Sequence, residues 1–101
     1  MSDEVTPNMK IEYDAAKRQH TLETRGLDFE TITDVFDEFY LVRTDDRTDY
    51  GEVRYIMLGA LGDRPVVCVW TPRGDAVRVI SMRIADDDER EIYRRELERS
   101  R

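Results

Sequence analysis

The chain has 101 residues, which is enough for one compact domain and too few for two. Its formal net charge of -7 argues against simple non-specific binding to nucleic acid, which requires positive charge to displace counterions, but 16 Lys and Arg can still build a local basic site. No apolar stretch approaches the roughly 20 residues that span a membrane, and the acidic N-terminus has no secretory leader, so we expect a cytoplasmic protein.

The N-terminal residues predict a polar arm followed by a short strand. Residues 1–8 are polar and contain Pro7, so we expect a flexible N-terminus that precedes a single domain over residues 9–101. From Met9 to Tyr13, apolar and polar side chains alternate with the two-residue period of a strand.

Two short helices are predicted next, as a helical hairpin. Asp14 is placed to cap a helix that runs to about Arg25, and Gly26 provides the left-handed residue with which helices commonly end. Asp28 is placed to cap the second helix. The apolar positions of that helix follow the three-and-four spacing of a buried stripe: Phe29, Ile32, Val35, Phe36 and Phe39.

After the helices the periodicity becomes that of strands. Strands are predicted over Tyr40 to Thr44, Glu52 to Ala60, Val66 to Thr71 and Ala76 to Ile84. A polar loop over Asp45 to Asp49 and turns at Gly62-Asp63 and Thr71 to Asp75 connect them. The third strand has little polar interruption and should be central, with Pro65 at its start. The short connections predict antiparallel pairing.

A final helix completes the predicted fold. Asp86 and Glu89 have the spacing of a capping box, and the helix that they open runs to about Arg99. Its few apolar residues indicate weak packing on its own domain, or completion by a partner. The predicted class is α+β: a strand, a two-helix hairpin, an antiparallel sheet of about four strands and a C-terminal helix.

The sequence lacks the residues that metal sites and glycine-rich phosphate loops need. His20 is the only histidine and Cys68 the only cysteine, so there is no metal signature, and there is no glycine-rich phosphate loop. We therefore predict no metal and no cofactor. Cys68 lies in an apolar run and is interpreted as a buried, inert thiol. His20 lies within the first predicted helix and is interpreted as packed or solvated rather than catalytic.

Arginines supply the chemical pattern that remains. Glu52 and Arg54 share one face of a predicted strand, and Arg73 stands on the turn before the last strand. Arg78 and Arg83 lie on that last strand with opposite parity, so a regular strand would point them to opposite faces. A bulge, or the position of Arg83 at the exit of the strand, would bring the two together.

Such arginines suit a phosphate group, because the planar guanidinium donates two parallel hydrogen bonds and stays charged. A cluster of them would clamp the scissile phosphate of RNA, and Glu52 would act as general base on a ribose 2′-hydroxyl. The leaving oxygen would then take a proton from Tyr93, from Lys17 or from water held by arginine. The alternative is that the arginines only form salt bridges with the abundant Asp and Glu.

Aromatic and basic side chains elsewhere are candidates for contact with RNA. Trp70, Tyr50 and Tyr55 are of the kind that stacks on unpaired bases, with core packing as the alternative, favoured for Tyr55. Lys17 and Arg25 lie on the first predicted helix.

An ordered set of short stretches spans nearly the whole chain. These stretches are Ile11 to Lys17, Arg25 to Glu30, Val35-Phe36, Asp49 to Arg54, Val69 to Gly74, Arg78 to Ala85, Glu89-Arg90 and Tyr93. In this order they resemble the BrnT family and, more distantly, the RelE-like toxins.

The resemblance implies a RelE-like fold, in which an antiparallel sheet packed by helices exposes a surface that cleaves RNA. It implies the toxin of a type II toxin–antitoxin system, a metal-independent endoribonuclease that inhibits translation. It also implies a BrnA-like antitoxin with a ribbon-helix-helix domain, through which alone the complex would contact operator DNA. The recurring polar residues of the family correspond to Lys17, Glu52, Arg54, Arg78, Ser81, Arg83 and Tyr93.

One departure from the family bears on the candidate site. The family often has Lys-His-Gly at the end of the first helix, where this chain has Thr24-Arg25-Gly26, and Arg25 would bind phosphate rather than act as a base. The candidate catalytic residues are Glu52, Arg54, Arg78, Arg83 and Tyr93. The candidate RNA-binding residues are Lys17, Arg25, Trp70, Arg73 and Ser81. The departure and the acidic total leave an alternative function, a catalytically weak or inactive relative that acts as an antitoxin-binding co-repressor.

Overall fold

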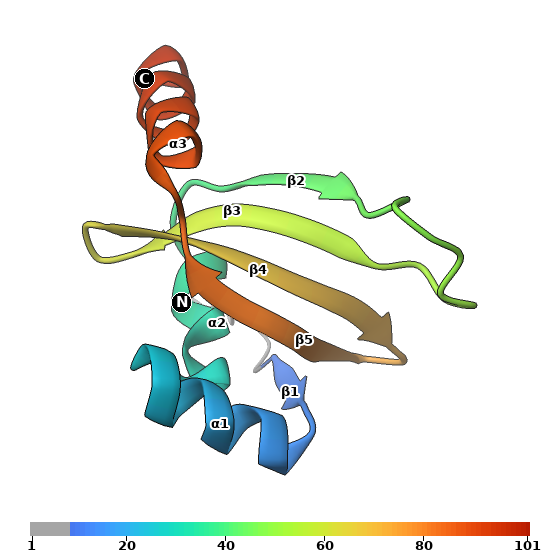
Figure 1. Cartoon of the computed structure of the whole chain (residues 1–101). Coiled ribbons are helices and arrows are strands. Elements are labelled where there is room, and N and C mark those ends of the chain that lie inside the picture. Colours follow the sequence, from blue (N-terminus) through green and yellow to red (C-terminus); the bar gives the residue numbers. More distant parts are fainter. Residues whose placement is uncertain (1–8) are drawn as a thin grey trace, which may run out of the picture.

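A computed structural model describes residues 9–101 as a twisted sheet with helices packed around it (Figure 1). The elements are β1 (Lys10–Glu12), α1 (Ala15–Arg25), the 3-10 turn η1 (Phe29–Thr31), α2 (Ile32–Phe36), β2 (Leu41–Thr44), β3 (Tyr55–Leu61), β4 (Arg64–Arg73), β5 (Ala76–Ile84) and α3 (Asp87–Arg99). The α+β class is confirmed, and the flexible arm expected over residues 1–8 lies outside the described residues. Within the described part, no helix is long and apolar enough to cross a membrane.

The strands β2 to β5 form the antiparallel meander that the sequence predicts, with β4 in the interior. The sheet has the order β1-β5-β4-β3-β2. At one edge β1 runs parallel to β5, with Lys10 opposite Ala76 and Glu12 opposite Arg78. This pairing adds the first predicted strand, for which the sequence predicts no partner, to the antiparallel strands. It is possible because the helices and three strands separate β1 from β5 along the chain, which gives the connection that parallel strands need.

The second predicted helix and the third predicted strand have different bounds from those expected. The helix is a 3-10 turn followed by α2, which ends at Phe36 instead of continuing to Phe39. The strand β4 continues beyond Thr71, because Pro72 and Arg73 still pair with β5. The turn predicted to begin at Thr71 is therefore confined to the end of the hairpin.

The ends of the long helices match the predicted caps. The Asp14 carboxylate accepts a hydrogen bond from the Ala16 amide, and Gly26 ends α1 in the left-handed conformation with a φ of 68°. At the start of α3, Asp86 and Glu89 make both hydrogen bonds of a capping box. These local hydrogen bonds and the left-handed Gly26 mark both ends of α1 and the start of α3.

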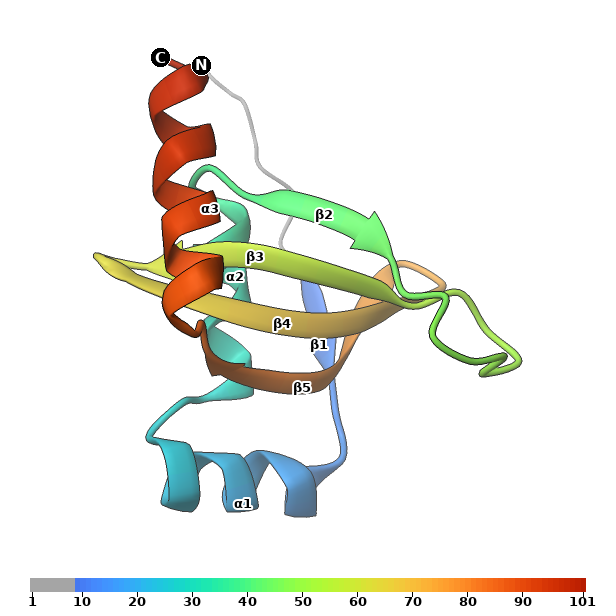
Figure 2. The ribbon, with the colours of Figure 1, turned by 45° about the horizontal axis from the view of Figure 1, so that its top comes forward.

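The core lies between α2 and one face of the sheet. Its buried side chains are Leu27, Phe29, Ile32, Val35, Met57, Val66, Cys68, Val79 and Met82. Burial raises the pKa of the Cys68 thiol to about 12, which confirms the interpretation of an inert cysteine. The helices α1 and α3 lie on opposite sides of the strands in both views (Figures 1 and 2).

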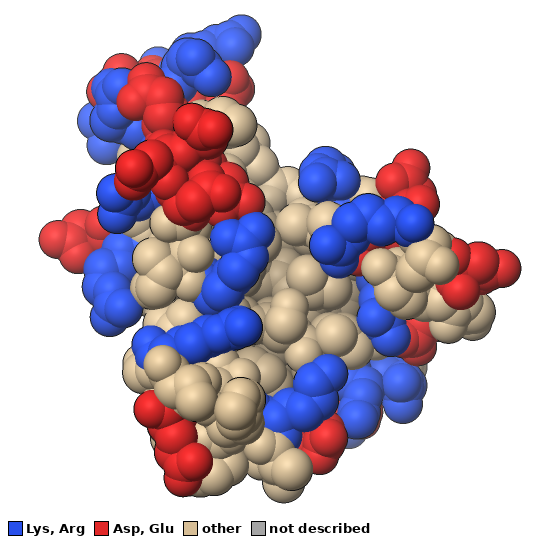
Figure 3. Space-filling view, viewed as in Figure 1, with Lys and Arg blue, Asp and Glu red and all other residues tan. Residues whose placement is uncertain are grey.

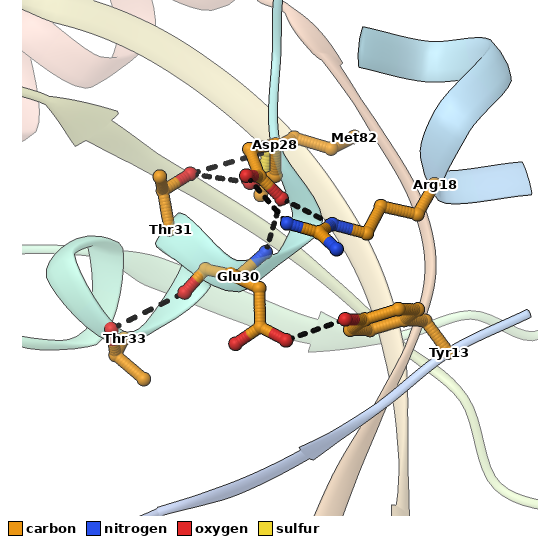
Figure 4. Close-up of polar contacts among 7 residues, drawn as sticks. All are labelled: Tyr13, Arg18, Asp28, Glu30, Thr31, Thr33 and Met82. Carbon is orange, nitrogen blue, oxygen red and sulfur yellow. Dashed lines mark hydrogen bonds and ion pairs between the residues drawn. The ribbon is translucent and has the colours of Figure 1, made fainter. Parts of the chain in front are cut away.

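A polar network joins α1 to the segment that leads into α2 (Figure 4). The Asp28 carboxylate accepts hydrogen bonds from Arg18 Nε at 2.8 Å and Nη2 at 2.9 Å, and another from the Glu30 amide at 3.0 Å. The Arg18 guanidinium also lies 5.3 Å from the ring centroid of Tyr13, whose hydroxyl donates to Glu30 at 2.6 Å. The network holds α1 in place beside β5.

Close packing of α2 on β3 requires a glycine at position 59. A Cβ on Gly59 would collide with Cγ1 of Val35, which is fully buried. We expect Gly59→Ala to lower the free energy of unfolding by about 1–2 kcal/mol, because a packed core has to shift to admit the methyl group. Urea unfolding measures this loss. If the collision is its cause, the loss should be smaller when Val35→Ala is already present; equal losses in both backgrounds would contradict the packing described here.

Candidate functional site

A bulge in β5 brings the polar residues of that strand onto one face. The register places Ser81 opposite Val69 and Val79 opposite Trp70, so Ile80 is the extra residue of a β-bulge. Alternation along the strand then puts three polar residues on the face opposite the core: Arg78, Ser81 and Arg83. Of the two ways that the sequence left open for Arg78 and Arg83 to share a face, the structure has the bulge.

We call this side of the sheet the open face. It consists of Leu41, Arg43, Ile56, Leu58, Val67, Val69, Thr71, Arg78, Ser81 and Arg83. Figure 3 shows Lys and Arg side chains spread around an uncharged, hollowed surface over the strands, with the acidic side chains of α3 above it. A chain with an acidic total thus presents a locally basic surface.

Glu52 lies between two arginines at one end of the open face. Its Oε2 accepts a hydrogen bond from Arg54 Nε at 3.1 Å, and its Oε1 lies 3.6 Å from Arg73 Nη2. The Val53 carbonyl accepts a hydrogen bond from the Thr71 hydroxyl at 2.6 Å. This contact holds the loop that carries Glu52 against Thr71, the residue that pairs with Arg78 across the strands.

The same contact explains a correction to the predicted strand over Glu52 to Ala60. The strand β3 begins at Tyr55, so Glu52 and Arg54 belong to the preceding loop. Arg54 stacks on the Tyr50 ring, 4.1 Å from its centroid. Side-chain contacts, and not strand alternation, therefore bring Glu52 and Arg54 together.

Arg78 and Arg83 differ in their surroundings. No carboxylate within residues 9–101 pairs with the half-buried Arg78. Arg83 donates from both terminal nitrogens to the two carboxylate oxygens of Glu89, each at 2.8 Å. This fork lowers the pKa of Glu89 to about 2, and it ties the start of α3 to the end of β5.

Tyr93 stands apart from the arginines. It is buried, and its hydroxyl donates to the Phe39 carbonyl at 2.9 Å. Burial raises the pKa of the Tyr93 hydroxyl above its ordinary value. The structure therefore gives Tyr93 a place in docking α3 on the segment before β2.

Trp70 also lies away from the open face. Its ring packs on the core side of the sheet, with its centroid 4.8 Å from that of Tyr55 and 5.3 Å from that of Phe36. This position favours core packing over stacking on RNA bases, the two interpretations that the sequence left open for Trp70. Core packing, the alternative, explains the residue, although its buried indole N–H lacks a partner in the described part of the chain.

The basic residues of α1 line a hollow against β5. This α1–β5 hollow, of about 360 Å³, is lined by Ala16, Lys17, His20, Thr21, Arg25, Ile80 and Ser81. Arg25 donates from Nη1 to the Met82 carbonyl at 2.9 Å, which fixes its guanidinium on the outer edge of β5. The predicted RNA-binding residues Lys17, Arg25 and Ser81 are thus brought together. His20, which sequence reasoning set aside, lies among them.

Within the described residues, no group of three or more His, Cys, Asp or Glu side chains is placed to hold a metal ion. The open face and the α1–β5 hollow offer guanidinium groups, one ammonium group, one imidazole and the Glu52 carboxylate. These groups can bind a phosphodiester and move protons.

Comparison with known proteins gives one family match. The family described as ribonuclease toxin, BrnT, of type II toxin–antitoxin system matches residues 13–89. No curated protein matches the chain. The matched span includes the arginines of the open face and the basic residues of α1, and it ends before Tyr93.

Proposed function

The chain belongs to the BrnT family of ribonuclease toxins of type II toxin–antitoxin systems, and from this premise we propose that it is a metal-independent endoribonuclease that cleaves RNA on the open face. The observation that carries the proposal is the bulge at Ile80, which aligns Arg78, Ser81 and Arg83 on one face. A phosphodiester that approaches this face meets several fixed donors at once. Such donors stabilise the negative charge that grows on phosphate oxygens as the bond breaks.

We assign the phosphate contact to Arg78 first, because its guanidinium has no carboxylate partner within residues 9–101. Arg83 is the second contact, and there a phosphate competes with Glu89 for the two terminal nitrogens of the guanidinium. Arg73, opposite Ala76 at the end of β4, extends the basic surface toward the hairpin.

Glu52 is the proposed general base. Arg54 and Arg73 hold its carboxylate, and the Thr71 hydroxyl holds the backbone of its loop at the Val53 carbonyl. In the proposed reaction Glu52 takes the proton of the ribose 2′-hydroxyl, and the 2′-oxygen attacks phosphorus. A bond from phosphorus to the 2′-oxygen forms, and the bond to the 5′-oxygen breaks; that oxygen must receive a proton.

The partners follow from the family and from the distribution of charge. We propose a cytoplasmic, RelE-like toxin neutralised by a BrnA-like ribbon-helix-helix antitoxin, which alone contacts operator DNA. A basic antitoxin suits a chain with a net charge of -7. An antitoxin segment over the open face would also cover the arginines that bind RNA.

Expression of the chain alone tests the proposal. We expect induction in bacteria to stop growth and degrade RNA, and co-expression of a ribbon-helix-helix antitoxin to restore growth. Purified protein should cleave RNA in the presence of EDTA, because no metal takes part. Normal growth with intact RNA would contradict the function, and cleavage that EDTA abolishes would contradict the mechanism.

A second function has one observation in its favour. Carboxylates already pair with arginines of the open face and of its end: Glu89 binds both terminal nitrogens of Arg83, and Glu52 forms ion pairs with Arg54 and Arg73. A toxin whose arginines are already paired with its own carboxylates would bind an antitoxin and act as a co-repressor without cleaving RNA. Tight complex formation together with intact RNA would favour it over the ribonuclease.

A further inference from the structure

We propose that His20 is a catalytic residue of this site, and that it donates the proton which the leaving 5′-oxygen requires. The inference rests on the proposed ribonuclease function and names the acid that this function leaves unassigned. His20 was interpreted from the sequence as packed or solvated. The structure places it in the α1–β5 hollow with Lys17, Arg25 and Ser81.

Ser81 connects this hollow to the arginines. It lines the hollow opposite α1, and it also lies between Arg78 and Arg83 on the open face. Because β1 pairs with β5 only from Ala76 to Arg78, the outer edge of β5 beyond Arg78 faces α1 instead of a strand. A phosphate bound near Ser81 is therefore reached from the sheet by the arginines and from α1 by His20.

The His20 side chain is accessible to a substrate. It is exposed, and no hydrogen bond within residues 9–101 involves its ring nitrogens; only its backbone carbonyl is used, by Thr24. Lys17 and Arg25 are the charged groups that α1 places in the hollow, and β5 contributes Ile80 and Ser81, which do not titrate. The cations attract the phosphate toward the imidazole.

The other groups near the site are less able to give a proton. Arginine stays charged at any relevant pH, and an ordinary lysine holds its proton far above neutral pH. The Tyr93 hydroxyl already donates to Phe39, and the Cys68 thiol is buried in the core. An imidazole exchanges its proton near neutral pH, and the chain has only this one.

In the proposed step the imidazolium of His20 gives its proton to the 5′-oxygen as the bond from phosphorus to that oxygen breaks. The products are a 2′,3′-cyclic phosphate, a 5′-hydroxyl and neutral imidazole. Glu52, which has taken the 2′-hydroxyl proton, returns the system to its starting charge by losing that proton to solvent, while the imidazole regains one. Atoms and protons therefore balance without a metal ion.

The test compares His20→Gln with wild type in single-turnover cleavage of RNA, with Gln19→Ala as the control on the same helix. We expect His20→Gln to lower the rate at least about 100-fold at neutral pH and to change the dependence of the rate on pH. Gln19 is also exposed, and its variant should cleave at the wild-type rate. A His20→Gln rate and pH profile equal to those of wild type would overturn the proposal.

A substrate with sulfur in place of the 5′-oxygen separates proton donation from a structural role, because a thiolate leaves without a proton. On this substrate His20→Gln should cleave at nearly the wild-type rate, whereas Arg78→Ala should stay impaired. A His20→Gln defect of equal size on both substrates would overturn the role of acid.

A binding measurement separates this proposal from the proposed function. If the wild-type protein cuts no RNA, the ribonuclease function fails. The imidazole signal of the single histidine, followed by NMR while a 2′-deoxy oligonucleotide is added, then decides whether His20 faces the bound phosphate. A shift of this signal that Arg78→Ala abolishes supports the placement of His20, and a signal that does not move overturns it.

Discussion

Arg78→Ala is expected to lower the rate of RNA cleavage by about 10²–10³-fold, the usual effect of removing one donor that stabilises charge in a transition state. Arg78 is the arginine of the open face for which this expectation is clearest. No carboxylate within residues 9–101 pairs with it, so its removal leaves no acidic group without a partner. The loss should therefore appear in the rate of the chemical step while the stability of the fold is kept.

Single-turnover cleavage of a short RNA measures this effect, and Arg64→Ala is the matched control. Arg64 is exposed at the start of β4, and alternation places it on the core side of the sheet, as it does Val66. Equal rates for Arg78→Ala and Arg64→Ala would contradict the proposal that RNA is cleaved on the open face. A lower rate caused by unfolding would instead appear as a lower urea midpoint for Arg78→Ala.

The sequence alone does not determine whether Arg78 and Arg83 lie on the same face of the sheet. The opposite parity of Arg78 and Arg83 is visible in the sequence, and it left two ways to bring them together, a bulge or a position of Arg83 at the exit of the strand. The position of the bulge was not predictable, because Val79, Ile80 and Ser81 fit a strand equally well in any register. Pairing with β4 decides that Ile80 is the extra residue.

Other differences also have their origin in tertiary contacts. Glu52 and Arg54 alternate like strand residues, yet the Thr71 hydroxyl binds the Val53 carbonyl and the ladder begins later. The parallel pairing of β1 depends on residues far along the chain. Signals that act within a few residues were read correctly, as the caps of α1 and α3 demonstrate.

The sequence holds a signal for the placement of His20 beside the basic residues of α1. Lys17, Thr21 and Arg25 recur at every fourth residue, which puts them on one face of a helix, and His20 borders this stripe. A stripe with two cations is not typical of a helix face that packs on the core, although the fold buries its threonine, Thr21. Such a stripe is typical of a helix face that is turned toward a polar surface, and His20 lies at the edge of that face.

The second large effect is expected at Asp28, which holds the helix that carries Lys17, His20 and Arg25. We expect Asp28→Ala to lower the free energy of unfolding by about 2–3 kcal/mol, from the loss of a helix cap together with a partly exposed, two-bonded contact to Arg18. Urea unfolding measures this loss. RNA cleavage should fall as well, because α1 is no longer held against β5.

Asp28→Asn separates the two contributions. Asparagine is an equally good cap, so this variant should lose only the part that depends on the charge of Asp28. Arg18 holds the pKa of the Asp28 carboxyl below its usual value, so this part is fully present above about pH 4 and disappears as the pH falls through the lowered pKa. The stabilities of wild type and Asp28→Asn should therefore differ at neutral pH and converge in acid. A difference that persists in acid would show that the amide disturbs the network by its shape, and that the charge of Asp28 does not hold α1 in place.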